Sequence, residues 1–437
     1  MKFNSNDVLS VAMPKIREKW LQAPDSFPEF LAEFPDKLRL ENEKVFRATA
    51  SKIQKIVSKF PADSHDMTRL SIKKRSVWRK KMTARILHIL NHEKALGIHR
   101  VMSHDRILSF YEELEAFLAL ARSFAPELKM DGIGQAIRNY IVYAMFVELA
   151  GGTAGLNPAA FGYSMLYPFT DNYIDSTEIS YREKQDYNRL IRETIGGRAV
   201  KPLPGHQQKT CELLWMIESK YPRNEDDSIY TLLQMMQDAQ EQSLRQQNRT
   251  EHLPESERLD ISIYKGGLSV LIDRCFVDRE LSQEDLLFYF GFGFFLQLAD
   301  DLQDIGEDIG NGHQTLMTLD VGFEACEKNV NKLFWFVWRI TGEYTTENEA
   351  FKRFVLENCF MLLSTSVLGS KEYFSPEYVE RLQKCMSISG EYWESARKNP
   401  LLIRNEAESG IETGRFTEED SLKMLDVIIG LEPEQQN

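Results

Sequence analysis

Glycine, proline and regular β-patterns are scarce in this chain. Its 437 residues include only 24 glycines and 15 prolines, and no segment sustains the alternation of apolar and polar residues that is typical of strands. Apolar residues instead recur every three or four positions, in segments rich in Leu, Glu, Lys, Arg, Gln and Ala, which indicates helices. We therefore expect an all-α fold, and with 43% hydrophobic residues the chain can bury a large core.

The chain also lacks the features of several other protein classes. Its five cysteines have no CxxC spacing and are odd in number, which favours reduced thiols that fill the core. The net charge of −13 argues against a nucleic-acid partner, because phosphate backbones need a basic surface. The N-terminal sequence MKFNSNDVLS has no apolar signal region, so we expect a cytoplasmic protein. The longest apolar run, Leu286 to Ala299, is too short to cross a bilayer, so we expect no transmembrane segment.

Changes in composition predict three parts. Residues 1–75 mix proline breaks with short amphipathic pieces and are expected to form an N-terminal helical extension. Residues 76–398 hold the strongest helical periodicity and are expected to form the main α-helical domain. Residues 399–437 are expected to form short helices and a polar tail.

The most informative segment is GFGFFLQLADDLQDIGED, residues 291–308. On a helix, Asp300, Asp304 and Asp308 fall at positions i, i+4 and i+8, with Asp301 on a neighbouring row. Neighbouring carboxylates repel one another by a few tenths of a kcal/mol per pair, roughly, so such a stripe usually accompanies a cation, and Mg²⁺ is the hard, oxygen-binding choice. The alternative is a solvated helix face. We favour the cation site because the preceding residues are apolar nearly all round, which indicates a buried helix whose carboxylates lie at the mouth of a pocket.

A second acidic group lies in FTDNYIDS, residues 169–176. Asp171 and Asp175 are at i and i+4 on one helix face, and Asn172 adds another oxygen donor. A DxxxD pair alone is common and usually marks an exposed helix end. Its informative feature is the pairing with the first group: two apolar helices, each ending in carboxylates, could face each other and hold metal ions between them.

These residues resemble a known family. LQLADDLQD, residues 296–304, is similar to the second aspartate-rich motif FQxxDDxxD of trans-prenyl diphosphate synthases. DNYID, residues 171–175, lies where that family carries its first such motif, and Lys265 lies about where it carries a diphosphate-binding lysine. The resemblance covers roughly residues 130 to 370 and implies that residues 76–398 form the all-α catalytic bundle of class I isoprenoid synthases.

The resemblance also implies a set of site residues. In that family, two acidic helices bind three Mg²⁺ ions that in turn hold a substrate diphosphate. The implied metal ligands here are Asp171, Asp175, Asp300, Asp301, Asp304 and Asp308. Lys265 and Arg182 would contact the diphosphate, and the pocket would be lined by Tyr167, Phe292, Leu296 and Gln297.

Departures from the family pattern narrow the predicted reaction. Chain-elongating members usually follow the first motif with paired arginines that help to bind isopentenyl diphosphate, but this sequence continues DSTEISYREK with only Arg182. Asn172 replaces an aspartate, and the basic GKR-type element is missing. The second motif also differs from the Asn/Ser/Glu triad of most terpene cyclases. The mixture is similar to bacterial enzymes that act on long prenyl diphosphates.

The sequence therefore predicts a Mg²⁺-dependent class I terpene synthase. It would ionise a prenyl diphosphate, release pyrophosphate, and cyclise the carbocation or eliminate a proton from it, with aromatic faces stabilising the cation. A chain-elongating or head-to-head condensing prenyltransferase on the same fold is the alternative. A non-catalytic partner subunit is a third hypothesis of another class. A homodimer is compatible with each, and the sequence leaves the oligomeric state open.

A histidine pair is a further candidate metal site. His88 and His92 lie one helical turn apart and could ligate zinc, but no third ligand is identifiable nearby except by invoking His99 or His104. A solvated helix face is the favoured interpretation.

Overall fold

Every element of regular structure in the described part of the chain is a helix, which confirms the predicted all-α class. The computed structural model describes residues 6–57, 72–93, 97–152, 155–176, 178–223, 228–247, 252–398 and 418–431. Within these ranges, none of the helices combines the length and the apolar character that crossing a bilayer requires.

The chain folds into two compact units. Unit 1 comprises residues 1–32 and 139–383, and unit 2 comprises residues 33–138 and 384–437. These units do not coincide with the predicted domain boundaries after residues 75 and 398, which stay a prediction. Two helices cross from one unit into the other along the chain, α6 (Met130–Leu149) and α16 (Pro376–Cys385).

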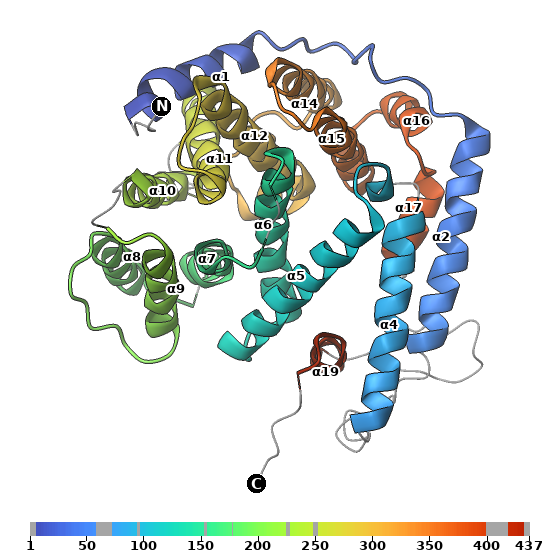
Figure 1. The fold of residues 1–437 in the computed structure, drawn as a ribbon. Coiled ribbons are helices and arrows are strands. Elements are labelled where there is room, and N and C mark those ends of the chain that lie inside the picture. The colour runs from blue at the N-terminus through green and yellow to red at the C-terminus, as the bar shows by residue number, and fades with distance from the viewer. Residues whose placement is uncertain are drawn as a thin grey trace. The chain divides into compact units, whose positions relative to one another are not determined.

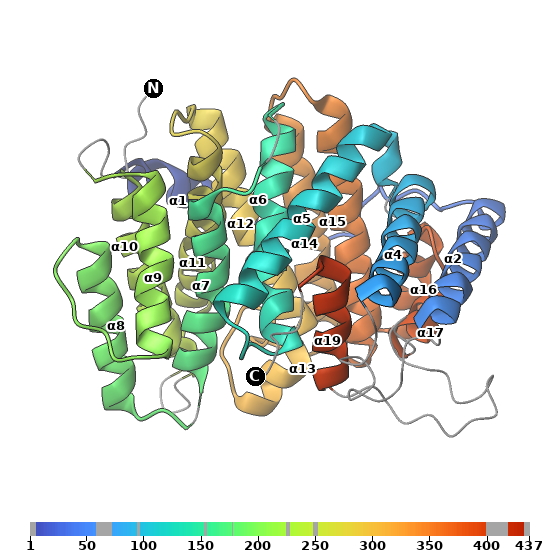
Figure 2. The ribbon, with the colours of Figure 1, turned by 60° about the horizontal axis from the view of Figure 1, so that its bottom comes forward.

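Unit 1 is a helical bundle, and Figure 2 shows α7, α9, α10 and α11 side by side with their axes roughly aligned. Its elements, coloured by position in Figure 1, are a π-helix at Val8–Ala12, α1 (Met13–Leu21), α7 (Pro158–Asp175), α8 (Tyr181–Ile195), α9 (His206–Lys220), α10 (Ser228–Ser243), a 3₁₀ turn at Leu244–Gln247, α11 (Glu255–Val277), α12 (Gln283–Gln303), α13 (Ile305–Asn311), α14 (Phe323–Glu343), α15 (Glu349–Gly369) and a 3₁₀ turn at Lys371–Tyr373.

Helices α11 and α12 pack with their backbones in contact. A Cβ atom on Gly266 of α11 would lie 2.6 Å from the carbonyl oxygen of Gly293 in α12, and a Cβ on Gly293 would meet the Gly266 carbonyl. Side-chain carbons do not approach that closely, so only glycine fits at both positions. The same contact brings Lys265, the residue before Gly266, close to Gln297 of α12. A Cβ atom built on Gly266 would lie 2.7 Å from the Cβ atom of Gln297.

Helix α12 is buried on most sides, as its apolar sequence predicts. Phe288 stacks on Tyr344 with ring centroids 4.1 Å apart, and Phe294 packs edge-on against Trp20 at 5.5 Å. Ser282 starts the helix with a capping box, in which reciprocal hydrogen bonds to Asp285 satisfy free amide groups of the first turn. The carboxylates at the end of α12 are therefore attached to a helix whose position is set by core packing.

Unit 2 has its own core. It contains α2 (Asp36–Val57), α4 (Ile72–His92), a 3₁₀ turn at Ile98–Arg100, α5 (His104–Phe124), α17 (Gly390–Lys398) and α19 (Glu418–Ile429). Met424 of α19 is buried in one cluster with Trp78 and Met82 of α4. Arg122 of α5 donates two hydrogen bonds to the carboxylate of Asp426, at 2.8 and 3.2 Å. A C-terminal helix is thus present, whereas residues 399–417 and 432–437 lie outside the described residues.

All five cysteines are free thiols, and all but Cys385 are buried. The prediction of reduced, core-filling cysteines is therefore confirmed for Cys211, Cys275, Cys326 and Cys359.

Candidate functional site: a carboxylate pocket in unit 1

The aspartates predicted to form one stripe lie where α12 ends and α13 begins. Asp304 stands between the two helices with φ −97° and ψ 8°, so the prediction of one continuous helix is wrong at this residue. Backbone hydrogen bonds still run from the amide of Asp304 to the carbonyl of Asp300 (3.0 Å) and from Asp308 to Asp304 (2.8 Å). The i,i+4 spacing of the carboxylates is therefore kept across the interruption.

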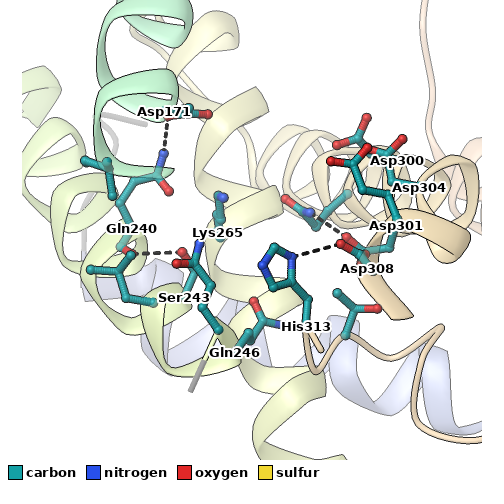
Figure 3. A pocket seen from close by; sticks show the side chains of 16 residues that line it. Asp171, Gln240, Ser243, Gln246, Lys265, Asp300, Asp301, Asp304, Asp308 and His313 are labelled. Carbon is teal, nitrogen blue, oxygen red and sulfur yellow. Dashed lines mark hydrogen bonds and ion pairs between the residues drawn. The ribbon is translucent and has the colours of Figure 1, made fainter. Parts of the chain in front are cut away.

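A single polar pocket brings the two predicted acidic segments together (Figure 3). It has about 960 Å³ of space between atoms, part of it open to solvent. In the view of Figure 3, Asp171 and Gln240 lie on one side, the aspartates of α12 and α13 on the other, and Lys265 between them. This carboxylate pocket is lined by Asp171, Ile174, Gln240, Ser243, Leu244, Gln246, Gln247, Lys265, Gln297, Asp300, Asp301, Asp304, Glu307, Asp308, His313 and Thr315.

Asp301 is the most deeply buried carboxylate of the pocket, at 7% exposure. Its Oδ1 accepts a hydrogen bond from the Gln297 amide (2.9 Å), whereas its Oδ2 is buried without a hydrogen-bond partner. Burial, followed by the negative charges of Asp300 and Asp308, raises the pKa of Asp301 to about 8. A cation beside Oδ2 would satisfy this atom and favour the charged form.

His313 lines the same pocket and contacts Asp308, the last of the four aspartates from the α12–α13 junction. Its Nδ1 lies 3.0 Å from Oδ1 of Asp308 (Figure 3). Burial raises the pKa of Asp308, and the charges of Asp304 and Glu307 add to the rise, while the contact with His313 opposes it. The wall thus gathers carboxylates, and Lys265 is the only lysine or arginine among the described residues that line the pocket.

The loop that carries His313 is held in place by Arg258, which is 4% exposed. The guanidinium donates hydrogen bonds to the carbonyl oxygens of Leu253 (2.9 Å) and Thr315 (3.0 Å) and to Oε1 of Gln314 (3.1 Å). Three charge-assisted bonds from one rigid fork give the loop a defined position.

The facing side of the pocket, formed by α7, α10 and the turn after α10, carries three glutamine amides and Asp171. Asp171, near the end of α7, accepts hydrogen bonds at Oδ1 from Nε2 of Gln240 (2.8 Å) and from the hydroxyl of Thr170 (3.0 Å). The 3₁₀ turn after α10 supplies Gln246 and Gln247. Amide groups can donate hydrogen bonds to an anion without adding charge of their own.

A second space, the apolar cavity, adjoins the carboxylate pocket. Its free cavity volume is only about 50 Å³, within about 500 Å³ of space between atoms that is partly open to solvent, and it shares Asp171, Ile174 and Gln240 with the carboxylate pocket. Its other lining residues come from α7, α8, α9 and α10: Tyr163, Leu166, Tyr167, Thr170, Ile191, Ile195, Leu214, Leu233, Met236 and Gln237. The hydrogen bond between Gln240 and Asp171 lies where the two spaces meet.

Two predicted ligands are not placed at the pocket. Asp175 is the last residue of α7, and its side chain lies outside the described residues. Arg182 is exposed in the first turn of α8 and is not among the residues lining the pocket.

Of the four residues predicted to line the pocket, two line one of the two spaces and two do not. Gln297 lines the carboxylate pocket, and Tyr167 lines the apolar cavity. Phe292 is 2% exposed and packs among other aromatic rings of the core, with centroids 5.7 to 5.9 Å away. Leu296 is half-buried one turn before Asp300 and lines neither space.

Several pocket residues were missed by sequence reasoning, notably Gln240, Gln246, Glu307 and His313. Two signals were present, the glutamine-rich segment before residue 247 and the loop GNGHQT. Neither the glutamine-rich segment nor the loop reveals, from the sequence alone, which of its side chains point towards an acidic helix that is distant in sequence.

The donor atoms suit a hard cation shared with a ligand. Across the described residues, no group of three or more His, Cys, Asp or Glu side chains is arranged to hold a metal ion by itself, and this includes His88 and His92, whose rings stack at 4.3 Å. Mg²⁺ is usually bound through one or two carboxylates together with water and substrate phosphates. A pocket of carboxylate oxygens, one of them buried and unpartnered, fits that mode of binding.

No protein-family model matches this chain, and neither a curated protein nor a solved structure is significantly similar to it. A function has to be inferred from the pocket itself.

Proposed function

We propose that the carboxylate pocket binds the diphosphate of a prenyl substrate together with Mg²⁺, and that the protein is a class I terpene synthase. One observation carries this proposal: aspartates from α7 and from the α12–α13 junction line a single pocket that also contains Lys265. The resemblance of DNYID and LQLADDLQD to paired aspartate-rich motifs points to the same two segments.

The balance of charge supports an anion that arrives with divalent cations. Asp300, Asp301, Asp304 and Asp308 would repel a bare diphosphate, and of the described residues lining the pocket Lys265 is the only lysine or arginine. Bridging cations would reverse that repulsion and would stabilise the charged form of Asp301. Asp171, Asp300, Asp301, Asp304 and Asp308 are the residues that would hold them.

The reaction would begin with cleavage of the allylic C–O bond. Mg²⁺ bound here would supply Lewis-acid stabilisation of the leaving diphosphate. Lys265 and the amides of Gln240 and Gln246 would hold its remaining oxygens by charge and hydrogen bonds. The apolar cavity beside Asp171 would have to widen to receive the hydrocarbon chain, and its apolar lining would then shield a carbocation from water.

Among the described residues that line the pocket there is one lysine and no arginine, which supports one diphosphate substrate rather than two. Chain elongation requires a second diphosphate, and a second anion needs its own cations. Arg182, which the sequence predicted to contact the substrate diphosphate together with Lys265, is exposed and lines no part of the pocket. This favours a synthase over an elongating prenyltransferase.

The proposal is tested by incubating the purified protein and Mg²⁺ with farnesyl, geranylgeranyl and longer diphosphates, with and without isopentenyl diphosphate. We expect pyrophosphate and a hydrocarbon or alcohol without isopentenyl diphosphate. A lengthened chain that forms only with isopentenyl diphosphate would show an elongating enzyme instead. Release of pyrophosphate from none of the substrates would favour a non-catalytic subunit.

Asp301→Asn and Asp171→Asn should each lower pyrophosphate release by about 100-fold or more, because each removes a carboxylate that would bind the divalent cations. The matched control is Asp186→Asn, the same change at an exposed residue of α8 that pairs with Arg189 at 2.7 Å. Release in the control should stay at the wild-type level. Equal activity of all the variants would contradict the site.

A further inference from the structure

Helix α4 of unit 2 concentrates charge of one sign. It has seven lysines or arginines and no aspartate or glutamate, although the whole chain has a net charge of −13. The carboxylate pocket and the apolar cavity make no use of this helix. A basic helix face is often merely solvated, so its meaning depends on which of the basic side chains point outward.

The arginines of α4 belong to the packing of unit 2. Arg79 is half-buried and pairs with Glu115 of α5 at 2.8 Å, and a Cβ on Gly430, just after α19, would touch its guanidinium. Nε of Arg75 is buried, and Arg85 is half-buried. Helix α4 packs against α2, α5 and α19, and Figure 2 shows it beside α2.

The lysines of α4 face outward. Lys73, Lys74, Lys80 and Lys81 are all exposed, and they surround Val77, which is itself 47% exposed. Two of the lysines precede Val77 by four and three positions, and two follow it by three and four. On a helix these five residues therefore share one face, within one turn of Val77 on either side. We call them the lysine patch.

Most of this charge is not neutralised within the fold. Lys73, Lys80 and Lys81 make no hydrogen bond or ion pair with the residues that the structure describes. His88 is exposed on the same face, two turns beyond Lys81. Burial, followed by nearby positive charges that include Lys52 of α2, lowers the pKa of His88. The excess of positive charge therefore extends beyond the lysine patch and includes a second helix.

An anionic lipid surface is the partner that fits this face. A lysine carries a point charge on a flexible stem, which can reach the phosphates of many lipids without a fixed geometry. Sequence-specific nucleic-acid recognition relies largely on arginine forks, and the arginines of α4 are held in the packing of unit 2. Val77, at the centre of the patch, offers an apolar contact of the kind that helices on membrane surfaces make with the headgroup layer.

We propose that the lysine patch docks the protein on membranes that contain anionic phospholipids. The four ammonium groups lie among the lipid phosphates, and the side chain of Val77 enters the headgroup layer. A prenyl diphosphate with a long hydrocarbon chain partitions into such membranes, so docking would bring the enzyme to its substrate. That last link rests on the proposed function, whereas the docking itself does not.

The test mixes the full-length protein with sedimentable vesicles, either of phosphatidylcholine alone or of equimolar phosphatidylcholine and phosphatidylglycerol. We expect the wild type to sediment only with the anionic vesicles and to be released by added salt. Lys80→Glu combined with Lys81→Glu should weaken this binding by about tenfold or more. Lys201→Glu combined with Lys220→Glu, at exposed lysines of unit 1, changes the net charge equally and should leave binding within about twofold of wild type.

Two further variants probe the lysine patch without charge reversal. Lys73→Gln combined with Lys74→Gln, at the other end of the patch, should weaken binding to the anionic vesicles by about fivefold or more. Val77→Trp places a fluorophore at the centre of the patch. Its emission, measured as the difference from wild type, should move to shorter wavelength with the anionic vesicles and stay unchanged with phosphatidylcholine alone.

The docking surface would be overturned if the wild type did not sediment with the anionic vesicles, or if the two Lys→Glu double variants bound them equally. An unchanged emission of Val77→Trp would also overturn it. Lysine-dependent binding of single-stranded RNA without binding to vesicles would assign the patch to a nucleic acid instead. Pyrophosphate release from a prenyl diphosphate in the absence of vesicles tests the proposed function separately, so the two failures are distinguishable.

Discussion

Two buried aspartates show how neighbours decide the chemistry of one residue type. Asp301 and Asp273 both have a buried oxygen without a hydrogen-bond partner, and burial raises the pKa of both. Asp301 stands beside other carboxylates at the edge of a polar pocket, where a cation can reach it. Asp273 is fully buried in α11 and lines neither space, so burial favours its neutral, protonated form.

At the residue scale, Asp273→Asn should change how stability depends on pH. The folded pKa of Asp273 is raised above the unfolded value of about 3.9, so its contribution to stability is fully present below about pH 4 and is lost as the pH rises through the folded pKa. Urea unfolding at a series of pH values measures this. The free energy of unfolding of the wild type should fall relative to that of the variant as the pH rises from about 4 towards neutrality. Parallel pH profiles would show that Asp273 is ionised in the fold.

At the scale of elements, the site depends on one helix pair and one anchored loop. The glycine contact brings α11 and α12 together and thereby places Lys265 beside the turn of Gln297. Arg258 holds the loop of His313 against the other side of the pocket. Neither the glycine contact nor Arg258 lines the pocket. Both nevertheless fix the positions of side chains that would bind a ligand.

Gly266→Ala should separate α11 from α12, because its new methyl carbon would lie 2.6 Å from the Gly293 carbonyl. We expect a loss of about 1–3 kcal/mol in the free energy of unfolding, measured with urea, together with weaker Mg²⁺-dependent pyrophosphate release. Gly342→Ala in α14 is the control, since a Cβ there meets nothing within 4 Å. It should be neutral or stabilising by up to about 1 kcal/mol. Similar losses from both changes would contradict the close packing of α11 and α12.

Arg258→Met should loosen the loop from Gly312 to Thr318, because it removes three hydrogen bonds from a buried cation. We expect a loss of about 1–3 kcal/mol and faster amide hydrogen exchange in peptides that cover the loop. Arg245→Met removes an exposed ion pair with Glu257 and should change stability by less than about 1 kcal/mol. Unchanged exchange in the loop would show that Arg258 does not hold it.

At the scale of the whole molecule, unit 1 contains the candidate site and unit 2 forms a separate core. Every residue that lines the carboxylate pocket or the apolar cavity belongs to unit 1, although unit 1 is built from two separate stretches of chain. Unit 2 has a core of its own, closed by α19 against α4. Changes in that core should therefore act on stability and spare the chemistry.

Met424→Ala tests this division. Met424 is 2% exposed in the unit 2 cluster, so its truncation should cost about 2–5 kcal/mol in unfolding free energy. Pyrophosphate release per folded molecule should match the wild type. Leu40→Ala, at a residue 66% exposed in α2, should change stability by about 0.5 kcal/mol or less. Lost release in a Met424→Ala protein that remains folded would show that unit 2 contributes to catalysis.

Residue spacing alone was sufficient for the helical class, the burial of α12 and the positions of Asp171 and Asp300 near helix ends. Each of these depends on a few turns of chain, in which apolar residues recur with the helical period. The interruption at Asp304 was beyond such reasoning, since the hydrogen bonds of Asp304 and Asp308 preserve the i,i+4 spacing on both sides of it.

Only the tertiary structure decided which of these residues meet. It places Asp171, Lys265 and Asp301 around one pocket and adds Gln240 and His313 from segments without a recognised motif. It leaves Arg182 outside, and it buries Asp273 completely in the interior of unit 1. The reason is physical: helical periodicity is a local property that neighbours in sequence determine, whereas burial, charge and reach of a side chain depend on helices that are distant in sequence and adjacent in space.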